Sequence, residues 1–132
     1  MSDVVIEAFG PSLENAFENA ARALEDTLVD IRTVEPKLEE RISLQAPSKE
    51  ALLYDWLELL IIKLETEGML YSRFECNISN DESGYSLEAK LAGERFQESK
   101  HEQKVAVKAP TYHEMKIDER PDRVVVRFLL DL

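Results

Sequence analysis

Residues 48–68 read SKEALLYDWLELLIIKLETEG and predict a helix that the rest of the chain buries. Ser48 is a good helix N-cap, because its hydroxyl can accept from the free amides of a first turn. Gly68 is placed to terminate a helix that runs to about Thr66. Between Leu52 and Leu64, apolar residues spread around much of the helix circumference. So wide an apolar arc is typical of a buried helix, and we expect this one to pack under a sheet.

A second helix and a set of strands flank this segment. Ser12 precedes apolar residues that keep a helical rhythm from Leu13 to Leu28. Elsewhere apolar and polar residues alternate with a period of two, which indicates half-buried strands, and the turn-rich Asn80–Gly84 joins two of them as a hairpin. The expected strands are Asp3–Phe9, Leu38–Gln45, Leu70–Ile78, Tyr85–Leu91, Val105–Lys108, His113–Asp118 and Arg123–Leu130.

This order of elements predicts the class of fold. We expect a single α+β domain over residues 1–132, in which two helices pack on a mostly antiparallel sheet of about seven strands.

The chain is strongly and unevenly acidic. Its 132 residues carry 27 acids and 16 bases, a formal charge of −11, and 44% of them are apolar. That apolar share can close a core, and the charge argues against direct nucleic-acid binding. Residues 1–88 hold 19 acids and 7 bases, whereas residues 89–132 hold 8 and 9. The acidic part is either a solvated surface or a surface suited to a basic protein partner.

Several classes of site and location are disfavoured. One cysteine, Cys76, and two histidines are too few for a structural zinc site, and Cys76 lies on the apolar side of its strand. The common nucleotide-binding, hydrolase and metalloprotease motifs are missing from the sequence. Charges interrupt the apolar run Leu52–Leu64, which is shorter than the ~20 residues of a membrane span. We expect a soluble, cytoplasmic protein that does not associate with membranes.

Three carboxylates mark the two ends of the sequence. Asp131 precedes Leu132, whose main-chain carboxylate ends the sequence, and Asp3 stands at the start of the first expected strand. If the terminal strands lie side by side, these three groups converge, and their repulsion favours a cation between them. Oxygen ligands of this kind suit Ca²⁺ or Mg²⁺. The alternative is that all three are simply solvated.

A second polar cluster lies before the last hairpin. Both histidines of the chain, two lysines and a tyrosine fall within thirteen residues, which is unusual for a strand. The cluster is either an edge strand protected by Lys and Pro or a surface that binds a partner. Its members are His101, Lys104, Lys108, Tyr112 and His113.

Four stretches together resemble the archease family. Residues 108–113, KAPTYH, are similar to its K-A-x-T-Y-H signature, and residues 55–57, DWL, with 66–68, TEG, resemble its D-W-L…T-E-G helix. Residues 13–21, LENAFENAA, are similar to its first helix, and residues 128–132, FLLDL, to its C-terminal motif. The chain departs from the family at its start, which reads Met1-Ser2-Asp3: Asp3 keeps the Asp of the family's H-T-A-D motif, but the His and Thr of that motif are absent.

The resemblance implies an accessory protein rather than an enzyme. Archeases assist the RtcB-type RNA ligase of tRNA splicing by promoting guanylylation of its active-site histidine, so that the ligase turns over repeatedly. The family binds a divalent cation, described as calcium, through groups that correspond here to Asp3, Asp131 and the carboxylate of Leu132. Two alternatives stay open. One is a chaperone-like module that modulates an RNA-modifying enzyme such as a tRNA methyltransferase. The other is a metal-dependent hydrolase with His101 or His113 as its base.

Overall fold

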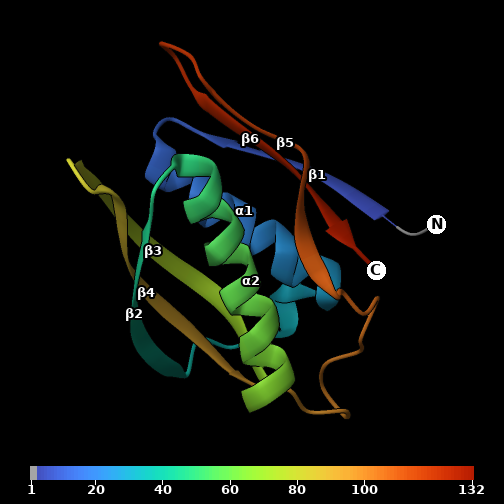
Figure 1. Cartoon of the computed structure of the whole chain (residues 1–132). Coiled ribbons are helices and arrows are strands. Elements are labelled where there is room, and N and C mark those ends of the chain that lie inside the picture. The colour runs from blue at the N-terminus through green and yellow to red at the C-terminus, as the bar shows by residue number, and fades with distance from the viewer. Residues whose placement is uncertain (1–2) are drawn as a thin grey trace.

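Two three-stranded antiparallel sheets enclose a pair of helices in this computed structural model, which describes residues 3–132 (Figure 1). The helices are α1 (Leu13–Leu28) and α2 (Lys49–Glu67), and a short 3₁₀ turn covers Ile31–Thr33. The strands are β1 (Asp3–Gly10), β2 (Leu38–Ala46), β3 (Met69–Asp81), β4 (Gly84–Arg95), β5 (Ala109–Glu119) and β6 (Val124–Asp131). The α+β class is confirmed.

The arrangement of the strands differs from the prediction. Within residues 3–132 there are six strands in two sheets, ordered β1-β6-β5 and β2-β4-β3, instead of about seven in one sheet. The expected strand Val105–Lys108 is wrong, because these residues belong to neither sheet. Its alternation comes from Val107, which is buried, and Val105, which packs against the core. The alternation therefore arises because one side of this segment is buried, and not because the segment is part of a sheet.

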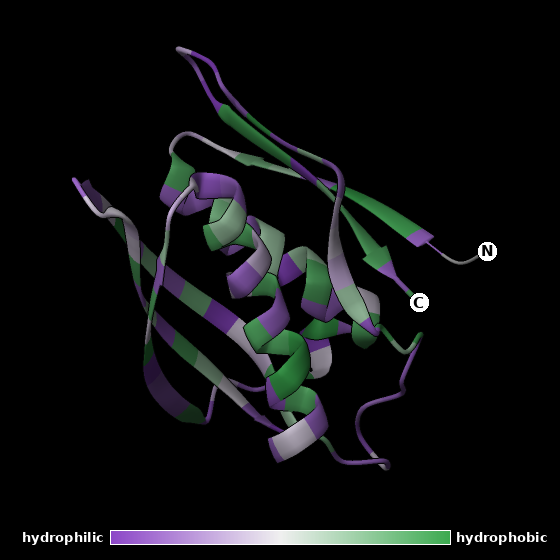
Figure 2. Cartoon of the chain, viewed as in Figure 1, coloured by the Kyte–Doolittle hydropathy of each residue, from purple (hydrophilic) through white to green (hydrophobic). Residues whose placement is uncertain are grey.

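The core lies between the two sheets, around the helices. Figure 2 shows apolar residues along β6 and in stripes on both helices. Trp56 is fully buried, donates from Nε1 to the carbonyl oxygen of Phe17 at 3.0 Å, and meets the Phe74 ring edge-on. Because a buried indole N–H needs an acceptor, this hydrogen bond fixes how α1 and α2 cross.

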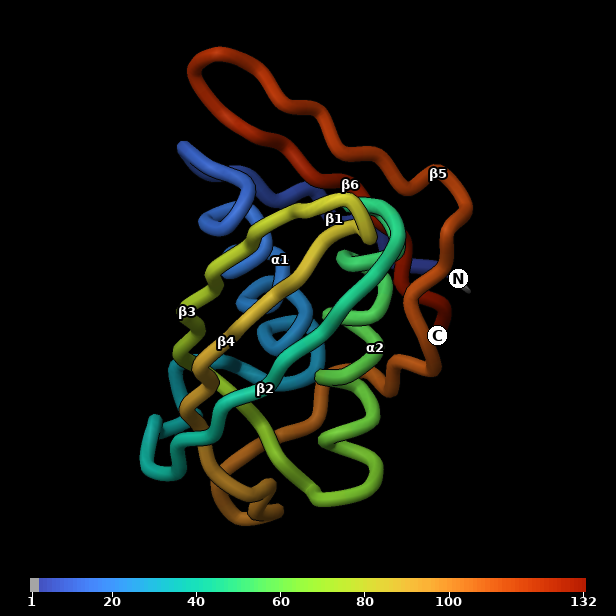
Figure 3. Tube along the Cα trace, turned by 60° about the vertical axis from the view of Figure 1, so that its left-hand side comes forward, coloured from blue at the N-terminus to red at the C-terminus, as the bar shows by residue number. Residues whose placement is uncertain are grey.

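Helix α2 is buried on one side only. Ser48 caps it by accepting from the Ala51 amide, and Gly68 ends it in the left-handed region at φ 67°, as predicted. Its buried residues are Leu52, Leu53, Trp56, Leu57, Leu60 and Ile61. The opposite side lies between β2 and β5, and there Ile62 is 45% exposed (Figures 1 and 3). Among residues 3–132, no helix is both long and apolar enough to cross a membrane.

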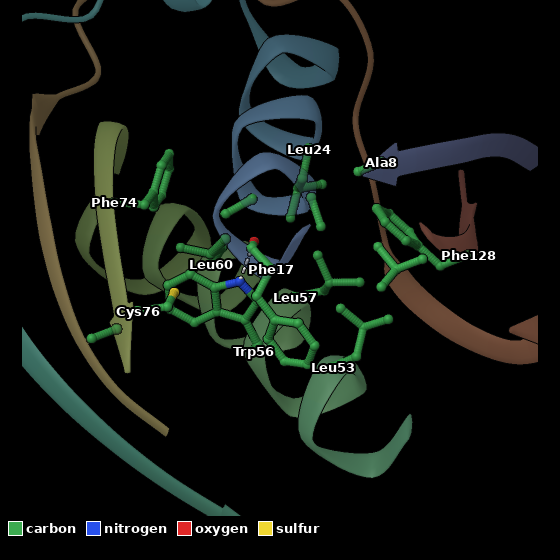
Figure 4. Packing of buried hydrophobic residues seen from close by; sticks show 14 of the residues in the cluster. Ala8, Phe17, Leu24, Leu53, Trp56, Leu57, Leu60, Phe74, Cys76 and Phe128 are labelled. Atoms are coloured by element: carbon green, nitrogen blue, oxygen red, sulfur yellow. Dashed lines mark hydrogen bonds between the residues drawn. The ribbon is translucent and has the colours of Figure 1, made fainter. Parts of the chain in front are cut away.

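Carboxylates of α1 cover the outer edge of β3. Glu18 accepts from the Cys76 amide at 2.8 Å, and Glu25, which is fully buried, accepts from the Tyr71 amide at 3.2 Å. Burial, with the nearby acids Glu18 and Glu14, raises the pKa of the Cys76 thiol to about 12. Cys76 packs in the core beside Trp56 (Figure 4) as an unreactive thiol, in line with the sequence interpretation.

At Gly93 of β4 the backbone of β3 leaves no room for a side chain. A Cβ at this position would lie 1.8 Å from the carbonyl oxygen of Leu70, beside the bulge between Tyr71 and Arg73. At Gly68, by contrast, no atom lies within 4 Å of an added Cβ. Only glycine therefore fits at position 93, whereas position 68 demands only a positive φ.

We expect Gly93→Ala to destabilise the protein by more than about 3 kcal/mol, because overlap with backbone forces the strands apart. Gly68→Ala is the matched control and should cost roughly 1–2 kcal/mol, the strain of a left-handed residue. Urea unfolding followed by circular dichroism measures both values. An equal loss of unfolding free energy in Gly93→Ala and Gly68→Ala would mean that β3 and β4 have room to separate at position 93.

Candidate functional site

The two terminal strands pair with each other. β1 and β6 are antiparallel over their whole length, from Asp3 opposite Asp131 to Gly10 opposite Val124. Val126, Phe128 and Leu130 of β6 point into the core, so Asp131 lies on the other face. Residues directly opposite one another share a face, and Asp3 and Asp131 are both exposed. The pairing thus brings two carboxylates together at one end of the sheet, where the start of β1 and the end of β6 lie side by side in Figures 1 and 3.

The backbone around Asp131 is well fixed. Ala109 of β5 is the register partner of Asp131 on its other side, and the Lys108 amide donates to the Asp131 carbonyl oxygen at 2.8 Å. Leu132 is half-buried, and its side chain packs against the core. Asp131 therefore sits on the central strand of its sheet, held from both sides.

The donor set fits a hard divalent cation. Opposed residues in an antiparallel pair have Cα atoms about 4.5–5.5 Å apart, so one ion can reach both carboxylates. Within residues 3–132, neither Asp3 nor Asp131 takes part in a side-chain hydrogen bond or ion pair. No group of three His, Cys, Asp or Glu side chains in that range could hold an ion. A cation here would need further oxygens, of which the Leu132 carboxylate is the nearest in sequence.

The residues of the second predicted cluster do not form one surface. His101 is buried, with only 1% of the residue exposed, so its ring offers nothing to a partner. Lys104 reaches the end of α1, where its amide donates to Leu28 and its ammonium to the carbonyl of Asp26. Lys108, Tyr112 and His113 are exposed along the start of β5. Of the five predicted residues, His101 is thus the one that the fold removes from the surface, and Lys104 lies apart from the three beside β5.

A buried ionic network that the sequence did not indicate explains the position of His101. Its Nδ1 accepts from the Gln97 amide at 3.0 Å, so Nε2 carries the proton and donates to Glu94 at 2.9 Å. Glu94 also accepts from the Glu35 amide, and Lys100 lies 2.7 Å away. In the sequence Glu94 falls on the polar side of the Tyr85–Leu91 alternation, so nothing marked it as buried.

The network ties the chain that precedes β5 to the end of β4. Burial opposes ionisation of Glu94, but hydrogen bonds from the Glu35 amide, Lys100 and His101 outweigh it and lower the Glu94 pKa from 4.5 to about 2. Glu94 is thus a buried carboxylate that its donors keep ionised. It anchors the stretch from Gln97 to His101, from which the chain runs on to Lys108 and the Asp131 carbonyl.

A wide bulge interrupts β5 at the signature residues. The register with β6 breaks between Thr111 and Lys116, and Glu114 adopts a positive φ of 56°. Such a conformation is strained for a non-glycine residue. At this bulge Tyr112 stacks on Tyr54 of α2, with ring centroids 4.4 Å apart and planes within 6°. The bulge therefore directs one tyrosine onto the helix instead of along the sheet.

Comparison with known sequences shows the family of this chain. A model of the Archease protein family matches residues 1–132. The archease of Sulfurisphaera tokodaii is 41% identical over 131 residues, which cover 99% of this chain and 93% of that protein. The archease of Pyrococcus abyssi is 43% identical over 121 residues, covering 92% and 85%. The chain belongs to the archease family, as the resemblance predicted.

Solved structures share the fold. The solution structure of protein 1598 of Methanobacterium thermoautotrophicum has a TM-score of 0.87 at 36% identity and covers 100% of this chain and 94% of that one. A crystal structure of an archease from Thermotoga maritima, described as a possible chaperone, has a TM-score of 0.65 at 17% identity, with coverage of 99% and 91%. At that identity the second likeness concerns the fold alone.

We expect Glu94→Gln to destabilise the protein at pH 7 by roughly 1.5–3 kcal/mol, because hydrogen bonds to a charged acceptor are weakened. The folded-state pKa lies below the ordinary 4.5, so the ionised carboxylate stabilises the fold fully above that pH. The contribution of the Glu94 carboxylate to stability falls as the pH drops from 4.5 toward 2, so the unfolding free energies of wild type and variant should converge at the acidic end of this range. Urea unfolding between pH 7 and pH 2.5 measures this.

The control for this experiment is Glu98→Gln, which makes the same chemical change at an exposed position of the neighbouring turn. It should leave stability nearly unchanged at every pH. A Glu94→Gln deficit that stays constant down to pH 2.5 would contradict an ionised Glu94 in the folded protein.

Proposed function

We propose that this archease is an accessory protein of an RtcB-type RNA ligase in tRNA splicing. In this proposal it promotes guanylylation of the ligase and its multiple turnover, acts in the cytoplasm, and does no chemistry of its own. Family membership over the full sequence supports the accessory role. The observation that carries the proposal is the pairing of Asp3 with Asp131 at one exposed end of the sheet.

The carboxylates have a definite task in this proposal. Asp3 and Asp131, with the carboxylate of Leu132, hold a divalent cation, with calcium as the expected ion. When bound, such a cation supplies positive charge next to phosphate oxygens of a nucleotide. The hydrogen bond from the Lys108 amide and the flanking β1 and β5 hold Asp131 in place. This rigidity lets the pair dock at the ligase nucleotide site without reordering its own backbone.

The charge of the chain suits such a partner. A surface that a ligase uses to bind RNA is expected to be basic, and this chain carries a net charge of −11. Association between the two should weaken as salt rises, since screening acts on exposed charges. The same charge argues that the protein reaches RNA through the ligase and not by direct contact.

A second candidate is a chaperone-like module that modulates an RNA-modifying enzyme such as a tRNA methyltransferase. The description of the Thermotoga maritima archease as a possible chaperone favours it. A chaperone suppresses aggregation of unrelated clients, whereas a ligase activator does not. Light scattering of a heated, unrelated client protein with and without this chain separates the two.

We expect Asp131→Asn and Asp3→Asn to abolish stimulation of multiple-turnover ligation by substoichiometric amounts of the protein. The rate of multiple-turnover ligation should fall by at least roughly tenfold, because even the loss of a residue that only hydrogen-bonds to a metal ligand lowers metal affinity or activity by that factor. The measurement is RNA joining by the partner ligase with GTP and divalent metal, beyond one turnover.

Asp122→Asn is the matched control, since it makes the same change at an exposed residue in the turn between β5 and β6. Asp122→Asn should stimulate ligation as much as wild type does. The melting temperatures of all three variants should lie within a few degrees of the wild-type value. Full stimulation by Asp131→Asn would refute the role of the carboxylate pair. If the wild-type protein itself did not stimulate ligation, the chaperone-like function would replace the role of ligase activator.

A further inference from the structure

An open groove runs along the outward side of α2. Tyr54, Glu58 and Ile62 follow one another at spacings of four residues, so they form one stripe on the helix between β2 and β5 (Figures 1 and 3). The groove beside this stripe has a volume of about 310 Å³. Its lining combines apolar and acidic side chains, with Leu44, Leu59 and Ile62 among the former and Asp55, Glu58 and Glu67 among the latter.

The negative charge of this groove is not balanced within the chain. Lys63 is the one cation in the lining, and it is already paired with Glu67 at 3.0 Å and with Glu40 at 3.2 Å. Across residues 3–132, neither Asp55 nor Glu58 takes part in a side-chain hydrogen bond or ion pair. Two carboxylates thus stand next to an exposed isoleucine, an arrangement that a cationic group with an aliphatic stem complements in both charge and polarity.

An aromatic platform adjoins these carboxylates on the β5 side. Tyr54 covers one face of the Tyr112 ring, and Tyr112 is still 54% exposed. Burial, then Asp55 and the phenol of Tyr54, and then Glu58 raise the pKa of the Tyr112 hydroxyl, so these acids lie within electrostatic reach of the ring. Planar guanidinium groups stack on tyrosine and pair with carboxylates at the same time, whereas ammonium groups are less suited to stacking.

The strand that carries the platform is the neighbour of the strand that carries Asp131. Ala109 is the register partner of Asp131, and Tyr112 follows three residues later on the same strand. Three residues of extended chain span roughly 10 Å. Tyr112 therefore lies within roughly 10 Å of Ala109 along β5, and beside the bulge that holds Glu114 its ring stacks on Tyr54 of α2.

We propose that this α2 groove binds an arginine-bearing segment of the protein partner, whose guanidinium stacks on Tyr112 between Asp55 and Glu58 while its aliphatic neighbours cover Leu59 and Ile62. The inference rests on the proposed function for the identity of the partner, the RtcB-type ligase, and assigns the contact that holds it. The carboxylate pair acts at the ligase nucleotide site, and the α2 groove supplies affinity.

The test is the affinity of the full chain for the partner ligase, measured by titration calorimetry at low and physiological salt. Glu58→Lys reverses one charge of the groove and should weaken binding at least about tenfold. Glu82→Lys is the matched control, because it makes the same change at the exposed tip of the β3–β4 hairpin and should alter affinity less than about twofold. Tyr112→Leu keeps an apolar side chain but removes the platform, and should also weaken binding.

The outcomes separate this inference from the proposed function. Suppose that wild type binds and stimulates the ligase, and that Glu58→Lys and Glu82→Lys bind with the same affinity. This result would overturn the proposed binding at the α2 groove but leave the ligase as the partner. Absence of any wild-type binding or stimulation would remove both proposals. A wild-type dimer in sedimentation that Glu58→Lys dissociates would show that a second copy fills the groove, which also overturns it.

Discussion

The first strand of the chain pairs with the last, and both the core and the candidate site are built on that pairing. β1 and β6 lie more than a hundred residues apart in sequence and yet match from Asp3–Asp131 to Gly10–Val124. Their inward residues, among them Ala8 and Phe128, close one side of the core over α1. Without this pairing the helices would expose that face, and the two aspartates would belong to unrelated ends of the chain. One set of strand contacts thus builds both the core and the candidate site.

The local elements were readable from the sequence because their signals are local. Ser12 and Ser48 cap their helices and Gly68 ends the second one, each by geometry that one or two turns determine. The β3–β4 hairpin followed from alternation around a turn. The grouping into two sheets could not be read in the same way, since strand partners depend on long-range packing. The strand predicted at Val105–Lys108 was wrong for that reason, because burial of Val107 produces the alternation although the segment lies in neither sheet.

The candidate site was foreseeable only in part. Acids at both ends suggested convergence, and the register of β1 with β6 gives the neighbouring positions that the hypothesis required. The histidine cluster was grouped by proximity in sequence, but the fold divides it: His101 anchors the interior through Glu94, while Tyr112 turns to α2 at a bulge. A bulge and a buried ion pair depend on contacts between distant segments, which residue spacing does not encode. The α2 groove likewise needed the structure, because its acids and its tyrosine come from separate elements.

In the proposed function, Asp3 and Asp131 act as one cation site. The most direct measurement is calorimetric titration of calcium into the chelator-treated protein, for wild type and for Asp3→Asn, Asp131→Asn and Asp122→Asn. We expect one bound ion in wild type and in Asp122→Asn, and no bound ion in Asp3→Asn or Asp131→Asn. Unchanged calcium binding in either of the latter two, with the fold intact, would contradict it.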